Sequence, residues 1–173
     1  LSQQFGNILE RMKSKRSINT LSYRLILHDL QNPSQAFKEP SKLVKEMSEE
    51  DKQRAITEYN NRLEAGQLIS TADNGNRIKL FDMLTAAGYD EKSILKNLSI
   101  SRSGESDFIQ VVYSSQNPSL SAFVVNTFSS DFISYYNGIA IAGQRKSLAI
   151  LDTMLQSKQS EMQRKSAEAR RTL

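Results

Sequence analysis

The chain has 173 residues, enough for one domain or for one domain with an extended arm. It has no cysteine and one histidine, which excludes disulfides, thiolate metal sites and the usual nucleophile–base pairs of enzymes. The net charge is +4, with 16 basic and 16 acidic residues over 1–139 but 7 and 3 over 140–173. We therefore expect no catalytic site, no cofactor and no metal, and a basic C-terminal segment.

The first thirty residues are predicted to form two helices. Apolar residues at helical spacing predict one helix over about 2–13 and another over about 18–30, with the basic polar segment 14–17 between them. The second helix ends at Pro33, because the residue before a proline disfavours helical backbone. The only histidine, His28, falls in this second helix, where a structural role is far commoner than a functional one.

Residues 31–41 contain two prolines among polar residues and are predicted to form a loop, which is the best internal boundary. Ser48 then begins a capping-box pattern for a helix that ends at Gly66, a residue suited to left-handed backbone. A further helix is expected over about 77–87. The segment 73–76, Asp-Asn-Gly-Asn, has some calcium-loop character but lacks the spacing of such loops, so a tight turn is favoured.

Residues 90–114 are predicted to form a short helix followed by a hairpin. Asp90 is a candidate cap for a helix that runs to Leu98. Residues 98–102 and 107–114 alternate between apolar and polar positions, as half-buried strands do, and residues 103–106 form the turn between them. A lone hairpin is marginally stable, so helices must pack against this one.

A long helix is predicted to begin at Pro118. Asn117 offers an N-cap acceptor, and the fixed φ of proline suits the first helical position. Apolar residues over 120–132 follow helical spacing, and no proline comes later. Gly138 and Gly143 each cost about 1 kcal/mol in a helix interior, which marks Gly138 as the place where a kink or break would occur.

The end of this helix carries a second apolar series. Leu148, Leu151, Leu155 and Met162 follow heptad-like steps along the helix. At about 100° per residue they lie on the opposite side of the helix from the apolar residues of 120–132. We expect the first turns to pack on the strand and the last turns to require another helix or protomer. The candidate contact residues are Arg145, Leu148, Leu151, Leu155, Met162 and Arg164, with Arg170 and Arg171 beyond them.

Taken in order, these features resemble the chain-length-determinant (Wzz-type) polysaccharide co-polymerases, including export forms associated with a tyrosine kinase. The resemblance covers the first forty and the last eighty residues, and the region 41–96 departs from the short connection expected. Matching residues early in the chain are Ile8, Leu9, Ser14, Ile18, Leu21 and Leu25. Later matches are Leu98 to Ile100, Gly104, Asp107 to Val111, and the motif residues Asn117, Pro118, Ala122 and Asn126.

The resemblance implies an α/β (α+β) fold, in which several helices pack on a small mixed sheet and a long C-terminal helix extends from this base. The base would comprise residues 1–130, near the membrane, and the helix residues 118–173. It also implies a non-enzymatic homo-oligomeric scaffold at the periplasmic face of the inner membrane, working with a polysaccharide polymerase or export machinery. Membrane segments would flank the chain, and any kinase would lie elsewhere in the full-length protein.

Two other classes of protein fit the residues. One is a helical adaptor or coiled-coil module of a cell-envelope transport assembly. The other is a nucleic-acid-binding fragment that uses the basic tail, although the tail lacks the clustered aromatics that stack on single-stranded bases, so we expect no nucleic acid. For Asn126, a hydrogen bond to the strand or loop backbone and exposure on the surface are equally compatible with the sequence.

Overall fold

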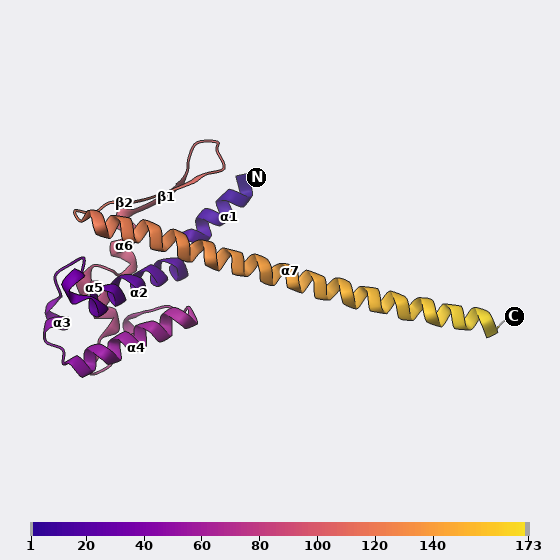
Figure 1. Ribbon diagram of the computed structural model, residues 1–173, viewed down its shortest axis with the longest axis horizontal. Coiled ribbons are helices and arrows are strands. Elements are labelled where there is room, and N and C mark those ends of the chain that lie inside the picture. The colour runs from indigo at the N-terminus through magenta and orange to yellow at the C-terminus, as the bar shows by residue number, and fades with distance from the viewer. Residues whose placement is uncertain (1, 172–173) are drawn as a thin grey trace. The chain divides into compact units, whose positions relative to one another are not determined.

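The computed structural model describes the backbone of residues 2–171 and the side chains of residues 3–168 (Figure 1). The α-helices are α1 (Ser2–Met12), α2 (Lys15–Gln31), α3 (Lys42–Lys45), α4 (Glu49–Ala65), α5 (Leu80–Ala87), α6 (Glu91–Asn97) and α7 (Pro118–Arg171). The 3-10 turns are η1 (Pro33–Gln35) and η2 (Thr71–Asp73), and the strands are β1 (Leu98–Arg102) and β2 (Ile109–Tyr113). The expected α+β fold is confirmed, and the strands described form an antiparallel pair where a mixed sheet was expected.

Helix α2 begins one residue after Ser14, earlier than the apolar pattern suggested. The Ser14 side chain accepts a hydrogen bond from the Ser17 backbone N–H at 3.3 Å, so the polar segment expected as a junction forms the first helical turn. At the other end, Asn32 caps the helix, since both its backbone and its side-chain N–H groups donate to the His28 carbonyl. The predicted stop before Pro33 is confirmed.

Helix α2 is the centre of the core and is buried on most of its circumference. It packs against α4, α5 and α6, and lies between α4 and the first turns of α7 (Figure 1). Its neighbours contribute two fully buried tyrosines, Tyr59 from α4 and Tyr89 from the α5–α6 connection. The buried residues of α2 are Ile18, Asn19, Leu21, Ser22, Tyr23, Leu25, Ile26 and Leu27.

The caps predicted at Ser48 and Gly66 are confirmed, whereas Asp90 stands at the N-cap position of α6 without a capping hydrogen bond from its side chain. The Ser48 side chain accepts from the Asp51 backbone N–H at 3.2 Å, and α4 ends at Gly66 with φ 60°, which favours glycine. The short helix α3 was not predicted. Helix α5 begins at Leu80, three residues later than expected, because the preceding segment turns back on itself through the bridge between Asn74 and Lys79.

Strands β1 and β2 pair in the register Leu98↔Tyr113, Ile100↔Val111 and Arg102↔Ile109. Ile100 and Tyr113 are buried whereas Val112 is exposed, so the predicted alternation is confirmed. The hairpin closes through a hydrogen bond from the Ser103 backbone N–H to the Phe108 carbonyl at 3.0 Å. One face of the sheet therefore joins the apolar core.

Helix α7 is uninterrupted from Pro118 to Arg171, with no break at Gly138. Its first turns place Leu120, Val124, Phe128 and Phe132 in the same core as the sheet residues. We expect these turns to pack on the strand, and they share its core; the Arg24–Asp131 pair and the His28–Phe123 contact join them to α2 as well. The chain divides into two compact units, one ending at Phe132 and one beginning at Ile133.

Candidate functional site

The side-chain amide of Asn117 forms hydrogen bonds at the start of α7 through both its oxygen and its nitrogen. Its Oδ1 accepts hydrogen bonds from the backbone N–H groups of Ser119 at 3.0 Å and Leu120 at 3.3 Å. Its Nδ2 donates to the carbonyl of Phe37 at 3.1 Å, which ties the helix start to the loop after α2. The predicted N-cap is confirmed, and the structure adds a long-range link that the Asn-Pro pattern does not contain.

The other motif residues do not gather around Asn117. Asp107 is exposed next to β2 and forms an ion pair with Arg102 at 3.8 Å. Ala122 and Asn126 are exposed on α7, and Asn126 lines a shallow hollow beside the Arg24–Asp131 pair. Of the two alternatives for Asn126, surface exposure is the one observed. The motif therefore consists of a capped helix start, and its other residues, Asp107, Ala122 and Asn126, are exposed to solvent.

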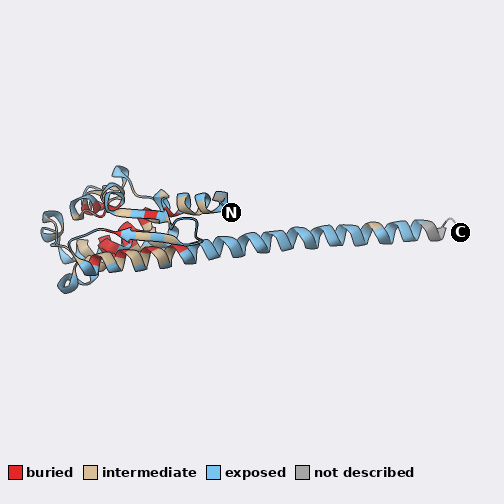
Figure 2. Ribbon diagram, turned by 90° about the horizontal axis from the view of Figure 1, so that it is seen from above, coloured by how far each residue is buried: buried red, intermediate tan, exposed pale blue. Residues whose placement is uncertain are grey.

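Every residue of α7 from 133 to 160 is exposed, and the second apolar series lies mainly within this segment (Figure 2). The side chains of Leu148, Leu151, Leu155 and Met162 are between 58% and 71% exposed. Sequence reasoning missed the exposed Ile141, Ile150 and Met154, which a count of every large apolar residue after Ile133 would have found. We call the residues Leu148, Leu151, Leu155 and Met162 the distal apolar series.

Charged residues lie among the distal apolar series. Lys158 and Lys165 both contact the Glu161 carboxylate, at 2.9 Å and 2.8 Å. Hydrogen bonds from Lys165 and then from Lys158 lower the pKa of Glu161 below its usual value. Arg164 pairs with Glu168 at 3.5 Å, while Arg145 is exposed. The side chains of the predicted contact residues Arg170 and Arg171 lie outside the described residues.

Acidic and histidine side chains do not gather into a metal-binding group among the residues described. His28 stacks on Phe37 with ring centroids 4.0 Å apart, which is a packing role. Asp73 pairs with Arg62 at 3.0 Å and accepts from the Ser70 backbone N–H at 2.8 Å. Asp73 is therefore occupied within the fold. It ends the 3-10 turn η2, and the chain reverses between Asn74 and Lys79, later than the tight turn favoured for residues 73–76.

Between residues 2 and 171, no helix has an apolar stretch that would suffice to cross a lipid bilayer. Comparisons of the chain with known protein families, curated proteins and solved structures find no match. The candidate functional feature is therefore defined by its geometry: a capped helix start at Asn117 and an exposed apolar series later in the same helix.

Proposed function

We propose that the chain is the periplasmic scaffold domain of an inner-membrane polysaccharide co-polymerase, which regulates the chain length or export of a surface polysaccharide or exopolysaccharide. The scaffold acts by assembling with copies of itself and with the polymerase or export machinery. It catalyses no reaction, and membrane segments of the full-length protein anchor it. The resemblance of the hairpin, the Asn117-Pro118 helix start and the long helix to chain-length-determinant proteins supports this proposal.

The observation that carries the proposal is the exposure of the distal apolar series. Full burial of one leucine side chain is worth about 1.5–3 kcal/mol, so several exposed leucines on one helix favour association with a partner surface. Leu148, Leu151 and Leu155 follow a/d heptad steps, as the seam of paired helices requires. A scaffold that assembles from several protomers needs such a surface.

The same heptad steps place Lys158 within the seam. A single polar residue at a seam position fixes register and partner number at a cost in stability. Lys158 is held by Glu161 on its own helix, which reduces the charge that a partner would meet. The seam is therefore suited to a specific partner helix in a defined register.

The experiment is gene deletion followed by complementation with the full-length protein. We expect deletion to change the length distribution of the surface polysaccharide, seen on gels, and the wild-type gene to restore it. The double variant Leu151→Asp/Leu155→Asp should fail to restore it and should lose oligomers detected by cross-linking. The matched control Gln156→Asp/Gln159→Asp adds the same charge at exposed polar positions and should restore the distribution.

An unchanged polysaccharide length distribution after deletion would contradict the proposal. If deletion instead impaired another envelope transport process, the helical adaptor class would be favoured, because the distal apolar series would serve such a module equally well. The complete reading frame offers an independent check, since the proposal requires apolar spans of about 20 residues on both sides of this chain.

A further inference from the structure

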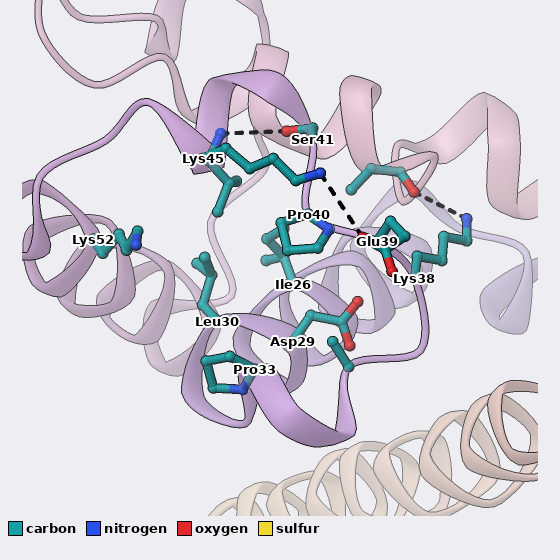
Figure 3. A pocket seen from close by; sticks show the side chains of 13 residues that line it. Ile26, Asp29, Leu30, Pro33, Lys38, Glu39, Pro40, Ser41, Lys45 and Lys52 are labelled. Atoms are coloured by element: carbon teal, nitrogen blue, oxygen red, sulfur yellow. Dashed lines mark hydrogen bonds and ion pairs between the residues drawn. The ribbon is translucent and has the colours of Figure 1, made fainter.

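A cavity of about 300 Å³ lies between α2, α3, α4 and the loop that follows α2 (Figure 3). Its walls are mostly apolar: Ile26 and Leu30 come from α2, Val44 from α3, and Pro33 and Pro40 from the loop. The volume is at the lower end of the range typical of small-molecule sites. The cavity belongs entirely to the unit that ends at Phe132 and is separate from the distal apolar series.

Three lysines line this apolar cavity, each from a different segment. Lys38 belongs to the loop, Lys45 to α3 and Lys52 to α4. Lys45 reaches across Pro40 toward Glu39, with 3.8 Å between the paired atoms (Figure 3). These three ammonium groups place positive charge at the edge of the apolar cavity.

Two carboxylates, Asp29 and Glu39, also line the cavity, so three lysines against two carboxylates leave its lining with one net positive charge. Asp29 is committed to the fold, because its Oδ2 accepts from the Tyr89 hydroxyl at 2.6 Å and its Oδ1 from the Phe37 backbone N–H at 2.9 Å. Glu39 is 93% exposed, so its pair with Lys45 is a surface ion pair. Such exposed pairs contribute little to stability, and Lys45 is therefore available to another anion.

Lys52 and Lys38, at the edge of the cavity, differ in how firmly their ammonium groups are held. Lys52 pairs at 2.6 Å with Glu49, whose side chain is highly exposed, so this contact is also open to exchange. Lys38 is fixed, since its Nζ donates to the carbonyls of Ala87 and Gly88 at the end of α5. Burial lowers the pKa of Lys38, and the nearby carboxylates of Asp29 and Asp90 act in the opposite direction. A bound anion would stabilise all three ammonium groups.

We propose that this cavity binds a small amphipathic carboxylate, namely a free medium-chain fatty acid. The acyl chain lies against Ile26, Leu30 and Val44, and the carboxylate meets Lys45 and Lys52 at the edge. The apolar walls require the acyl chain, because a fully polar anion gains nothing from burial against them. The ligand must also carry a negative charge, because it replaces the carboxylates that now pair with Lys45 and Lys52. This binding is independent of the scaffold role proposed above.

The experiment is an NMR titration of the chain with octanoate, observed through its backbone amide signals. We expect saturable shifts at the amides of Leu30, Val44 and Lys45, and weaker binding as salt rises. The double variant Lys45→Gln/Lys52→Gln removes both charge-assisted contacts and should weaken binding by at least about tenfold, the loss expected for one of them. The variant Lys42→Gln changes an α3 lysine that is 87% exposed and outside the cavity, and should bind as the wild type does.

Two ligand controls separate the contributions of charge and chain. Octanol keeps the acyl length without the carboxylate, and acetate keeps the carboxylate without the chain, so both should bind much more weakly than octanoate. Equal binding of octanol, or an equal effect of Lys42→Gln, would overturn the proposal. Shifts confined to residues after Ile133 would also overturn it, because they would show adsorption on the exposed apolar side chains of α7.

Discussion

The hydroxyl group of Tyr89 donates a 2.6 Å hydrogen bond to Oδ2 of Asp29, and this contact joins the α5–α6 connection to α2. Oδ1 of the same carboxylate accepts from the backbone N–H of Phe37 at 2.9 Å and lies 3.0 Å from His28 Nδ1. One carboxylate on α2 thus holds both the loop eight residues later and the α5–α6 connection sixty residues later. Helix α2 and this loop also line the cavity described above.

Replacing Tyr89 by phenylalanine should lower the free energy of unfolding by about 1–3 kcal/mol, because Asp29 loses a donor in a buried position. Urea denaturation followed by circular dichroism measures the loss. Tyr136→Phe is the matched control, since that side chain is exposed on α7, and its effect should be smaller than about 0.5 kcal/mol. Equal effects of the two variants would contradict the importance of the Tyr89–Asp29 contact.

The two asparagines of the sequence motif should differ in their contributions to stability. Asn117→Ala removes a helix cap and the bond to the Phe37 carbonyl, so we expect a loss of about 1–2 kcal/mol. Asn126→Ala, on the exposed side of the same helix, should cost less than about 0.5 kcal/mol. Thermal unfolding of both variants tests this difference.

A third variant separates the two roles of Asn117. In Asn117→Asp the acceptor for the N–H groups of Ser119 and Leu120 remains, but the donor to the Phe37 carbonyl is lost. Its stability should fall between those of the wild type and Asn117→Ala. A variant as unstable as Asn117→Ala would mean that the link to the loop, rather than the cap, supplies the whole effect.

The two apolar series of α7 should respond differently to a charge. Phe128 is buried in the core, so Phe128→Asp should unfold the unit that ends at Phe132, with a cost above about 3 kcal/mol. Leu155 is 58% exposed, and Leu155→Asp should leave the folded unit intact. Far-ultraviolet circular dichroism and amide NMR spectra report both results. Comparable loss of structure in the two variants would show that Leu155 contributes to the core.

Stability should decrease steeply in alkaline solution, because three buried tyrosines resist ionisation. Burial is the main cause that raises the pKa of Tyr23 from 10.0 to about 12, and burial likewise raises the pKa values of Tyr59 and Tyr89. Above pH 10 the unfolded chain releases protons that the folded chain retains, so unfolding becomes more favourable as pH rises. The stabilisation is complete below pH 10 and, for Tyr23, is lost as pH rises through about 12.

Urea denaturation at a series of pH values between neutrality and pH 12 measures this decline. Tyr23→Phe should be less stable at neutral pH, because it loses the hydrogen bond to the Gln67 carbonyl, but its stability should decline less steeply above pH 10. An equally steep decline in wild type and variant would show that Tyr23 does not contribute to the pH dependence.

Local chemistry made much of the secondary structure predictable. Ser48 and Asn117 each carry an acceptor for the first turn of a helix, and Gly66 accepts the left-handed backbone at a helix end. These effects act over three or four residues, so the sequence around each position contains the information. The alternation of apolar and polar residues similarly predicted which residues of β2 face the core.

The sequence determined both ends of α4, the start of α7, the hairpin and the two apolar series of α7, while the tertiary structure decided what each surface meets. Arg24 and Asp131 are 107 residues apart in the chain, yet their pair joins α2 to α7. The cavity likewise depends on residues from five segments, namely α2, the loop after it, α3, α4 and α5. The exposure of Asn126 depends on which parts of α7 the neighbouring segments cover. Periodicity gives the direction of a side chain relative to its own helix, but contacts between distant segments depend on how the whole core packs.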